Sequence, residues 1–324
     1  MERIITYSPA YTLVPTYECF NRCSYCNFRR DPGQDEWMSL AAAKKTLQSL
    51  QSQNAVPTVI EILILSGEVH PNSPRRAAWF QRIYDLCELS LSMGFLPHTN
   101  AGPLSREEMA QLREVNVSMG LMVEQLAPEL LETVHAHAPS KHPEMRLQQL
   151  ELAGELKIPF TTGLLLGLGE TEDDWKESLA AIAHSHTKHG HIQEVILQPH
   201  QPGTRQAETR PPCYGSYLAN AITLARDLLP ADITIQIPPN LIRSDEALLT
   251  CLALGAGDLG GIGPVDEANP DYPHRSHDVM DGLLEGAGMV LRSRLPIYEK
   301  YDDWLPTRLK ARVEDWRAEL GKTT

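Results

Sequence analysis

The sequence predicts an α/β protein, a closed (β/α)8 TIM-type barrel followed by a C-terminal helical extension. Eight short apolar segments alternate with longer amphipathic segments over about 250 residues, which is the pattern of such a barrel. Of the 324 residues, 42% are hydrophobic and 22% are charged, so a sizeable core is expected. We assign residues 1–276 to the barrel and residues 277–324 to the extension. An open doubly wound sheet is an alternative, because periodicity alone does not exclude it.

The expected strands are apolar runs of strand length. In chain order they cover 11–16, 58–65, 95–99, 117–123, 160–166, 193–198, 233–237 and a weak eighth near 251–256. Between them, apolar residues recur three or four positions apart, as Leu147 and Leu150 do, which is the period of a helix. The expected helices cover 39–53, 75–93, 105–114, 127–135, 143–156, 172–188, 214–228 and 244–250, and the closing segment 277–320 is also predicted to be helical.

The charge and the N-terminal sequence narrow the class of protein. A formal net charge of −13 argues against nucleic acid or an anionic membrane as a partner, because both are themselves negative. No apolar run approaches the roughly 18 residues of a membrane span. The opening MERIITYSPAYTL has no signal-peptide core, so we expect a cytoplasmic protein with reduced thiols.

Three of the six cysteines lie in the short stretch CFNRCSYC, which follows the first expected strand. Cys19, Cys23 and Cys26 have the spacing C-x3-C-x2-C. A structural zinc site uses four ligands, and no second C-x2-C or H-x3-H pair completes one. An iron-sulfur cube normally takes four thiolates, so three leave one iron with a vacant coordination position. The pattern therefore indicates a cluster that coordinates another molecule.

This spacing, with the aromatic Tyr25 before the last cysteine, resembles the radical S-adenosylmethionine (radical SAM) superfamily. The resemblance implies one 4Fe-4S cluster on Cys19, Cys23 and Cys26, with an open iron that binds the amino and carboxylate groups of SAM. An electron from the cluster then cleaves SAM into methionine and a 5′-deoxyadenosyl radical. A reduced donor such as ferredoxin or flavodoxin is implied as the source of that electron.

Further candidate SAM contacts follow successive strands. Ser66, Gly67 and Glu68 occupy the place of a GGE-like stretch that faces the methionine ammonium group. Polar side chains near later strand ends are expected at the ribose or the carboxylate of SAM, and glycines allow the backbone to approach adenine. With Tyr25 beside the nucleobase, this larger set is Asn100, Glu124, Arg146, Gly163 and Gly167.

Longer stretches resemble one group in the superfamily, the CofG-type subunit of FO synthase. They include YTLVPTYECFNRCSYCNFRR, IQEVILQPHQPGT and GAGDLGGIGPVDEANPDYP, and the likeness covers nearly the whole chain. The resemblance implies a small-molecule substrate, the adduct of a tyrosine-derived 4-hydroxybenzyl group with ribitylaminouracil. Hydrogen abstraction, ring closure and loss of ammonia then give the deazaflavin FO. A CofH-type subunit, which makes the adduct, is an expected partner.

Candidate substrate contacts are polar residues near later strand ends. Gln198, His200 and Asp258 are the main candidates, and amide groups such as those of Gln236 and Asn240 suit a uracil edge. Three alternatives stay open. The chain could be the CofH-type partner, another radical SAM cyclase, or a non-catalytic iron-sulfur or zinc scaffold.

Overall fold

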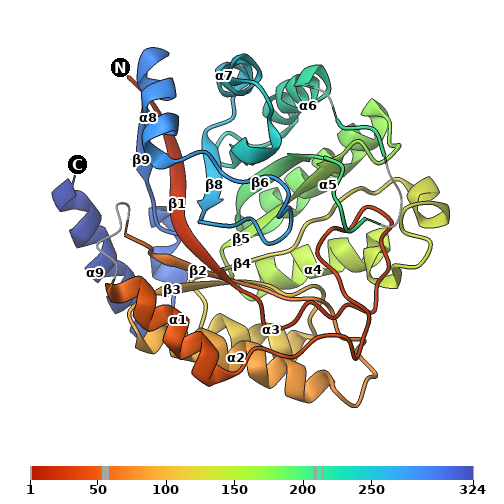
Figure 1. Cartoon of the computed structure of the whole chain (residues 1–324). Helices are drawn as coiled ribbons and strands as arrows, with labels where there is room; N and C mark the ends of the chain where they lie inside the picture. The colour runs from red at the N-terminus through yellow and green to blue at the C-terminus, as the bar shows by residue number, and fades with distance from the viewer. Residues whose placement is uncertain (1, 53–57, 207–209, 214, 324) are drawn as a thin grey trace.

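Eight parallel strands close into a barrel in the computed structural model, which describes residues 2–52, 58–206, 210–213 and 215–323 (Figure 1). Each strand pairs with the next along the chain, and β1 pairs with both β2 and β8, which closes the ring. The predicted (β/α)8 barrel is confirmed. The strands are β1 (Arg3–Leu13), β2 (Glu61–Leu65), β3 (Leu96–Asn100), β4 (Ser118–Gly120), β5 (Phe160–Leu166), β6 (Ile192–Pro199), β7 (Thr234–Gln236) and β8 (Asp258–Ile262).

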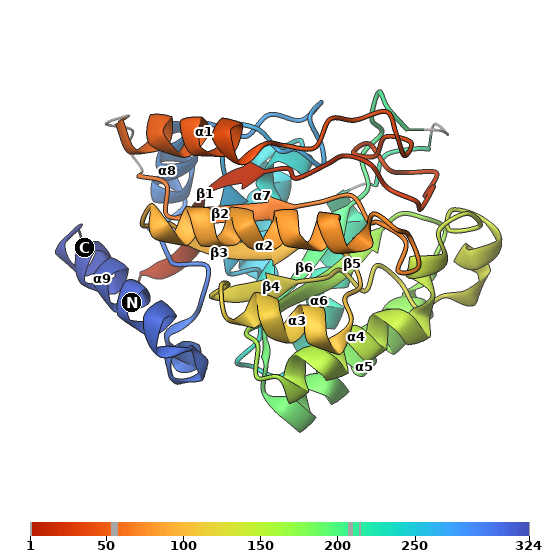
Figure 2. The ribbon, with the colours of Figure 1, turned by 90° about the horizontal axis from the view of Figure 1, so that it is seen from below.

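Helices connect the strands and cover the outside of the barrel (Figures 1 and 2). None in the described part of the chain is both long and apolar enough to cross a lipid bilayer. The connecting α-helices are α1 (Leu40–Ser52), α2 (Arg76–Ser92), α3 (Arg106–Arg113), α4 (Pro143–Glu155), α5 (Glu172–His189), α6 (Gly215–Leu228) and α7 (Asp245–Leu254), with short 3-10 turns at η1 (Pro128–Glu132), η2 (Pro139–Lys141) and η3 (Pro239–Leu241).

Local sequence signals mark several helix ends. Ser105 and Glu108 form a capping box at the start of α3, and Thr171 and Asp174 form another at the start of α5. In each box the side chains satisfy backbone N–H groups that have no partner within the helix. Gly190 ends α5 with a left-handed backbone, φ 70°, which glycine adopts without strain.

Side chains alternate between the barrel interior and the helices along each strand. In β2, Ile62 and Ile64 are fully buried in the main hydrophobic core, whereas Glu61, Leu63 and Leu65 line an internal cavity. Because strands of a parallel barrel run the same way, these inward residues mark successive depths from the amino end to the carboxyl end. The cavity is therefore built in layers.

The eighth strand lies later in the chain than predicted. Residues 251–254 form the last turn of α7, and β8 is Asp258–Ile262. Cys251 and Leu252 are buried against the core as part of a helix face, and a short apolar run does not by itself distinguish such a face from a strand. Gly255, with φ 132°, ends the helix.

Two other segments also differ from the prediction. β1 starts at Arg3, earlier than the predicted 11–16, because residues 3–7 pair with the strand β9 (Met289–Ser293), which was not predicted. Within the predicted helix 127–135 the structure has only the 3-10 turn η1, which Pro128 begins. Residue 53, at the end of the predicted first helix, and residue 214, at the start of another, lie outside the described residues.

The closing segment contains a strand as well as helices. It comprises α8 (His277–Gly286), β9 (Met289–Ser293), the 3-10 turn η4 (Glu299–Trp304) and α9 (Thr307–Thr323). β9 pairs in parallel with Arg3–Tyr7 of β1. α9 packs in a second hydrophobic cluster with residues such as Ile60 and Leu96, at the amino ends of the strands. Figure 2 shows α9 at one end of the barrel and the loop after β1 at the other.

Candidate active site

The three predicted cluster ligands lie together in the loop that follows β1. Cys23 is buried, and Cys19 and Cys26 are half-buried. Burial raises the pKa of Cys19 and of Cys23 to about 11, and a neighbouring cysteine adds to the rise in each case. Burial and the charge of Cys19 likewise raise the pKa of Cys26. The three sulfur atoms are therefore close enough to interact electrostatically.

Backbone hydrogen bonds hold this loop over the carboxyl ends of the strands. The Phe20 N–H donates to the Glu68 carbonyl at 3.0 Å, in the connection after β2. The Ser24 N–H donates to the Val134 carbonyl at 3.1 Å, in the connection after β4. Two loops far apart in the sequence thus fix the position of the cysteines.

Ser66 and Gly67 support the cysteine loop through their packing. A Cβ atom on Gly67 would lie 2.1 Å from the carbonyl oxygen of Glu18, so only glycine fits there. The Gly67 N–H donates to the Thr16 carbonyl at 2.8 Å. The Ser66 hydroxyl accepts a hydrogen bond from Trp79 Nε1 at 3.0 Å, which directs this side chain toward α2. Only the backbone of Ser66 is therefore available for a contact with SAM.

Glu68 and Arg146, 78 positions apart in sequence, meet next to the cysteine loop. Glu68 Oε1 lies 3.3 Å from Arg146 Nη2. The Glu68 carboxylate also accepts from Asn21 Nδ2 at 2.9 Å and from Ser140 Oγ at 2.5 Å, and Arg146 Nε donates to the Ser140 carbonyl at 2.8 Å. Arg146 is only 1% exposed, and Glu68 balances its charge in this structure.

Glu124 forms a second ion pair nearby, with Lys141 at 2.5 Å. Its φ of 67° is unusual for a residue with a side chain and holds the carboxylate in place at some cost in strain. Burial raises the pKa of Glu124, but Lys141 and Arg146 outweigh burial and the net pKa is lowered. Tyr25, the aromatic residue of the cysteine motif, bonds through its hydroxyl to His135 Nε2 at 3.1 Å.

The remaining predicted SAM contacts have different roles. Asn100 ends β3 and lines the internal cavity. A Cβ atom on Gly163 would lie 2.2 Å from the Ile196 carbonyl oxygen, so this glycine permits the close pairing of β5 and β6. Gly167 has φ 96°, and its N–H donates to the Glu170 carboxylate at 2.7 Å. Gly167 thus shapes the turn after β5.

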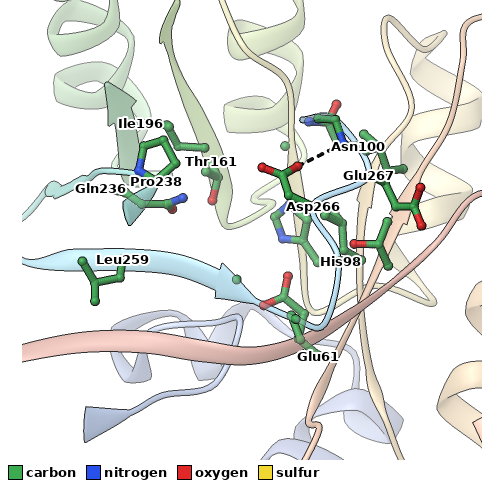
Figure 3. A pocket seen from close by; sticks show the side chains of 18 of the residues that line it. Glu61, His98, Asn100, Thr161, Ile196, Gln236, Pro238, Leu259, Asp266 and Glu267 are labelled. Atoms are coloured by element: carbon green, nitrogen blue, oxygen red, sulfur yellow. Dashed lines mark hydrogen bonds between the residues drawn. The ribbon is translucent and has the colours of Figure 1, made fainter. Parts of the chain in front are cut away.

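A cavity of about 210 Å³ occupies the barrel interior (Figure 3). Going from the amino to the carboxyl end of the strands, β2 contributes Glu61, Leu63 and Leu65, and β6 contributes Glu194, Ile196 and Gln198. On these two strands the carboxylates therefore lie deepest, below an apolar layer, whereas Asp266 and Glu267 line the cavity from the loop after β8. We call the deepest residues the floor layer, which comprises Glu61, His98, Thr161, Glu194 and Arg294.

Of the predicted substrate contacts, the structure brings Gln198 to the cavity and leaves two elsewhere. Gln198 lines it, as Gln236 and Asn240 do. Asp258 lies at the amino end of β8, fully buried, with its carboxylate paired to Arg294. His200 is buried beside Cys213, whose N–H donates to its carbonyl at 2.9 Å, and it is not among the residues that line the cavity.

Arg294 is the central charge of the floor layer. Its Nε and Nη2 donate to the two oxygens of Asp258 at 2.6 and 2.7 Å, and Nη2 also pairs with Glu194. Burial raises the pKa of Glu194, although Arg294 opposes that effect. Burial and the charge of Arg294 lower the pKa of His98 to about 3, so this imidazole is neutral near pH 7.

The sequence reasoning missed several of these residues. Ser140 and Lys141 lie in no recognisable motif, and Arg294 follows a strand that was not predicted. Glu61 did carry a signal, because it is the one charged residue in the apolar run TVIEILIL. A lone carboxylate inside a buried strand needs a polar environment, and the barrel interior supplies it.

Comparisons with known proteins agree with this geometry. A model of the Radical SAM superfamily matches residues 13–182. A relative from Trichormus variabilis is 63% identical over 97% of this chain and 91% of its own length, and one from Trichodesmium erythraeum is 60% identical over 99% of both. Both relatives are named 7,8-didemethyl-8-hydroxy-5-deazariboflavin synthase. The chain therefore belongs to the radical SAM superfamily.

Solved structures show that this radical SAM chain shares its barrel with distant proteins. The FeFe-hydrogenase maturase HydG from Carboxydothermus hydrogenoformans aligns with a TM-score of 0.71 at 18% identity, over 99% of this chain and 79% of that one. Methylornithine synthase, PylB, aligns with a TM-score of 0.67 at 17% identity, over 89% of this chain and 83% of that one. At these identities the likeness concerns the fold alone.

Membership of the radical SAM superfamily implies a 4Fe-4S cluster and SAM, and the donor set near the mouth fits both. Three thiols converge in one loop, beside the paired charges of Glu68, Arg146, Glu124 and Lys141. Within the described residues, no three His, Cys, Asp or Glu side chains are close enough to hold a single metal ion. A cube differs from such a site, because each thiolate binds a separate iron atom.

Proposed function

We propose that this chain catalyses the CofG-type step of FO synthesis. In this reaction the adduct of a tyrosine-derived 4-hydroxybenzyl group with ribitylaminouracil becomes the deazaflavin FO, and ammonia is released. The observation that supports the proposal most strongly is the 60–63% identity, over nearly the full length, to relatives named for that product. The polar, layered cavity under the cysteine loop offers the matching space for a substrate with an aromatic and a hydroxylated part.

In this proposal Cys19, Cys23 and Cys26 hold one 4Fe-4S cluster with an open fourth iron. When bound, the cluster supplies the electron that cleaves SAM, and a reduced ferredoxin or flavodoxin renews that electron. Glu68 accepts the amino group of SAM and Arg146 pairs with its carboxylate, both held in place by the bonds that Ser140 makes.

The barrel residues hold the substrate for hydrogen abstraction. The apolar layer that includes Leu63 and Ile196 excludes water from the substrate radical, and Gln198 and Asn240 offer amide groups to the uracil ring. Close placement of one C–H bond decides which hydrogen is removed. Ring closure onto the phenol ring and loss of ammonia then follow within the same cavity.

The test is anaerobic reconstitution of the protein, followed by incubation with SAM, dithionite and the purified adduct. FO fluorescence together with 5′-deoxyadenosine is the expected result. Formation of 5′-deoxyadenosine without FO would retain the superfamily chemistry and reject the CofG-type step. Adduct formation from tyrosine and ribitylaminouracil would instead identify the CofH-type reaction. A colourless protein that holds one zinc ion would identify a zinc scaffold and reject the enzyme.

A further inference from the structure

The floor layer presents hydrogen-bond acceptors to the cavity. His98 Nδ1 lies 2.7 Å from Ser118 Oγ, and Ser118 Oγ donates to the Pro296 carbonyl at 2.6 Å. Because the serine proton is used there, Nδ1 carries the histidine proton and Nε2 is an acceptor. A Cβ atom at Gly120 would lie 3.0 Å from Nε2, so this glycine keeps the space beside the acceptor open.

Glu61 is the second acceptor. Glu61 is only 7% exposed, lines the cavity and has no ion-pair partner among the residues that the structure describes. Figure 3 shows Glu61 beside β1 and β8. Burial raises the pKa of Glu61, although a hydrogen bond from Ser8 and the charge of Arg294 oppose that effect. A carboxylate accepts several hydrogen bonds, so a ligand with hydroxyl groups would add donors to the one that Ser8 supplies.

The hydrogen-bond donors of Arg294 and Thr161 in the floor layer already have partners within the protein. Arg294 donates through Nε and Nη2 to Asp258, through Nη2 to Glu194 and through Nη1 to the Leu295 carbonyl at 3.0 Å. The Thr161 hydroxyl donates to Glu194 Oε2 at 3.0 Å. The guanidinium charge is thus balanced by two carboxylates before any ligand arrives.

We propose that Glu61 and His98 bind the hydroxyl groups of the substrate's polyol chain, and that the floor layer selects the free polyol over its phosphate ester. This inference rests on the proposed function and extends it, because it orients the substrate with the polyol chain at the floor and the reacting ring below the cysteine loop. A hydroxyl can donate to both acceptors. A phosphate group brings negative charge and acceptor oxygens to a place whose arginine is already paired.

The first experiment compares three ligands on the reconstituted wild-type protein. They are the adduct with its free polyol chain, the phosphate ester of the same chain, and an analogue with an unsubstituted alkyl chain of equal length. Binding is measured by equilibrium dialysis under anaerobic conditions, together with FO or analogue turnover. We expect the phosphate ester and the alkyl analogue each to bind about 100-fold more weakly than the free polyol. Equal binding of the polyol and its ester overturns the proposal.

The second experiment tests Glu61 with a matched control. Glu61→Leu is expected to weaken binding of the free polyol by about 10- to 100-fold and to leave binding of the alkyl analogue unchanged. Glu61→Gln, which preserves the shape of the side chain, is expected to weaken binding of the free polyol less than Glu61→Leu does. It replaces the leucine variant in the experiment if that variant does not fold. Glu314→Gln, on the exposed face of α9, is the control. Equal losses for polyol and alkyl ligands would indicate only a structural role for Glu61.

The outcomes separate this inference from the proposed function. If wild-type protein yields no FO from the adduct, the proposed function fails. If it yields FO but uses the phosphate ester equally well, the proposed function stands and the role of the floor layer is rejected. Cleavage of SAM in the absence of substrate should be the same in wild type and in the Glu314→Gln control, because Glu314 lies on the exposed face of α9.

Discussion

The two ends of the barrel hold polar clusters that are built in different ways. At the mouth, the cysteines lie in one short loop. Glu68 approaches it from the connection after β2, and Glu124 and Arg146 approach it from the connection after β4. At the floor, Glu61 and Glu194 come from the strands β2 and β6, and the central Arg294 directly follows β9. The mouth is thus anchored by one local motif, whereas the floor exists only after the whole barrel has closed.

Replacing a cysteine tests the mouth and has the largest expected effect. Cys23→Ala removes one of three ligands, so we expect loss of most bound iron and no measurable cleavage of SAM. Iron content and 5′-deoxyadenosine formation are the measurements. Cys251→Ala, a buried cysteine far from the loop, should retain both. Full iron content in the Cys23 variant would contradict the assignment of the three ligands.

Replacing Arg294 tests the floor through stability. Arg294→Met leaves the Asp258 and Glu194 carboxylates buried without their partner, so we expect the free energy of unfolding to fall by about 3–5 kcal/mol. Urea denaturation measures this change. Arg308→Met removes an exposed ion pair to Glu88 and should cost less than about 1 kcal/mol. Similar losses of unfolding free energy in the two variants would mean that the ion pairs of Arg294 add little to stability.

The pH dependence of stability should show the buried histidine of the floor. His98 has a pKa near 3 in the folded protein and about 6.5 when unfolded, so the unfolded state binds more protons and folding weakens as pH falls below about 6.5. Between pH 7 and 5 this histidine should account for about 2 kcal/mol of lost stability. In His98→Gln, the free energy of unfolding should fall by about 2 kcal/mol less between pH 7 and pH 5 than it does in wild type. In the exposed control His184→Gln, it should fall as much as in wild type.

Ser140 offers a milder test of the mouth. Ser140→Ala removes one hydrogen bond to Glu68 and leaves the backbone carbonyl that holds Arg146, so we expect SAM to bind about 5- to 10-fold more weakly. Equilibrium dialysis with SAM measures the effect, and the free energy of unfolding should change little. Ser92→Ala, in an exposed position on α2, is the control. An unchanged affinity would remove Ser140 from the SAM site.

The features that the sequence predicts correctly lie within short segments, and the features that it misses are formed by residues far apart in the chain. The eight-strand pattern and the C-x3-C-x2-C spacing are each contained in short segments, so the barrel and the cysteine loop were predictable. The eighth strand was placed wrongly because the buried face of α7 has the same apolar composition as a strand. The floor was not predictable, because Glu61 and Arg294 are 233 positions apart and meet only through the closure of the barrel.

The long strand β1 uses one edge for two partners. Residues 3–7 pair with β9, and residues 10–13 pair with β2. During synthesis, residues 3–7 leave the ribosome long before their partners at 289–293 do. Until β9 emerges, the nascent chain carries an unpaired strand edge, which makes it open to wrong pairing and to recognition by chaperones. Removing the last 40 residues would make that exposure permanent.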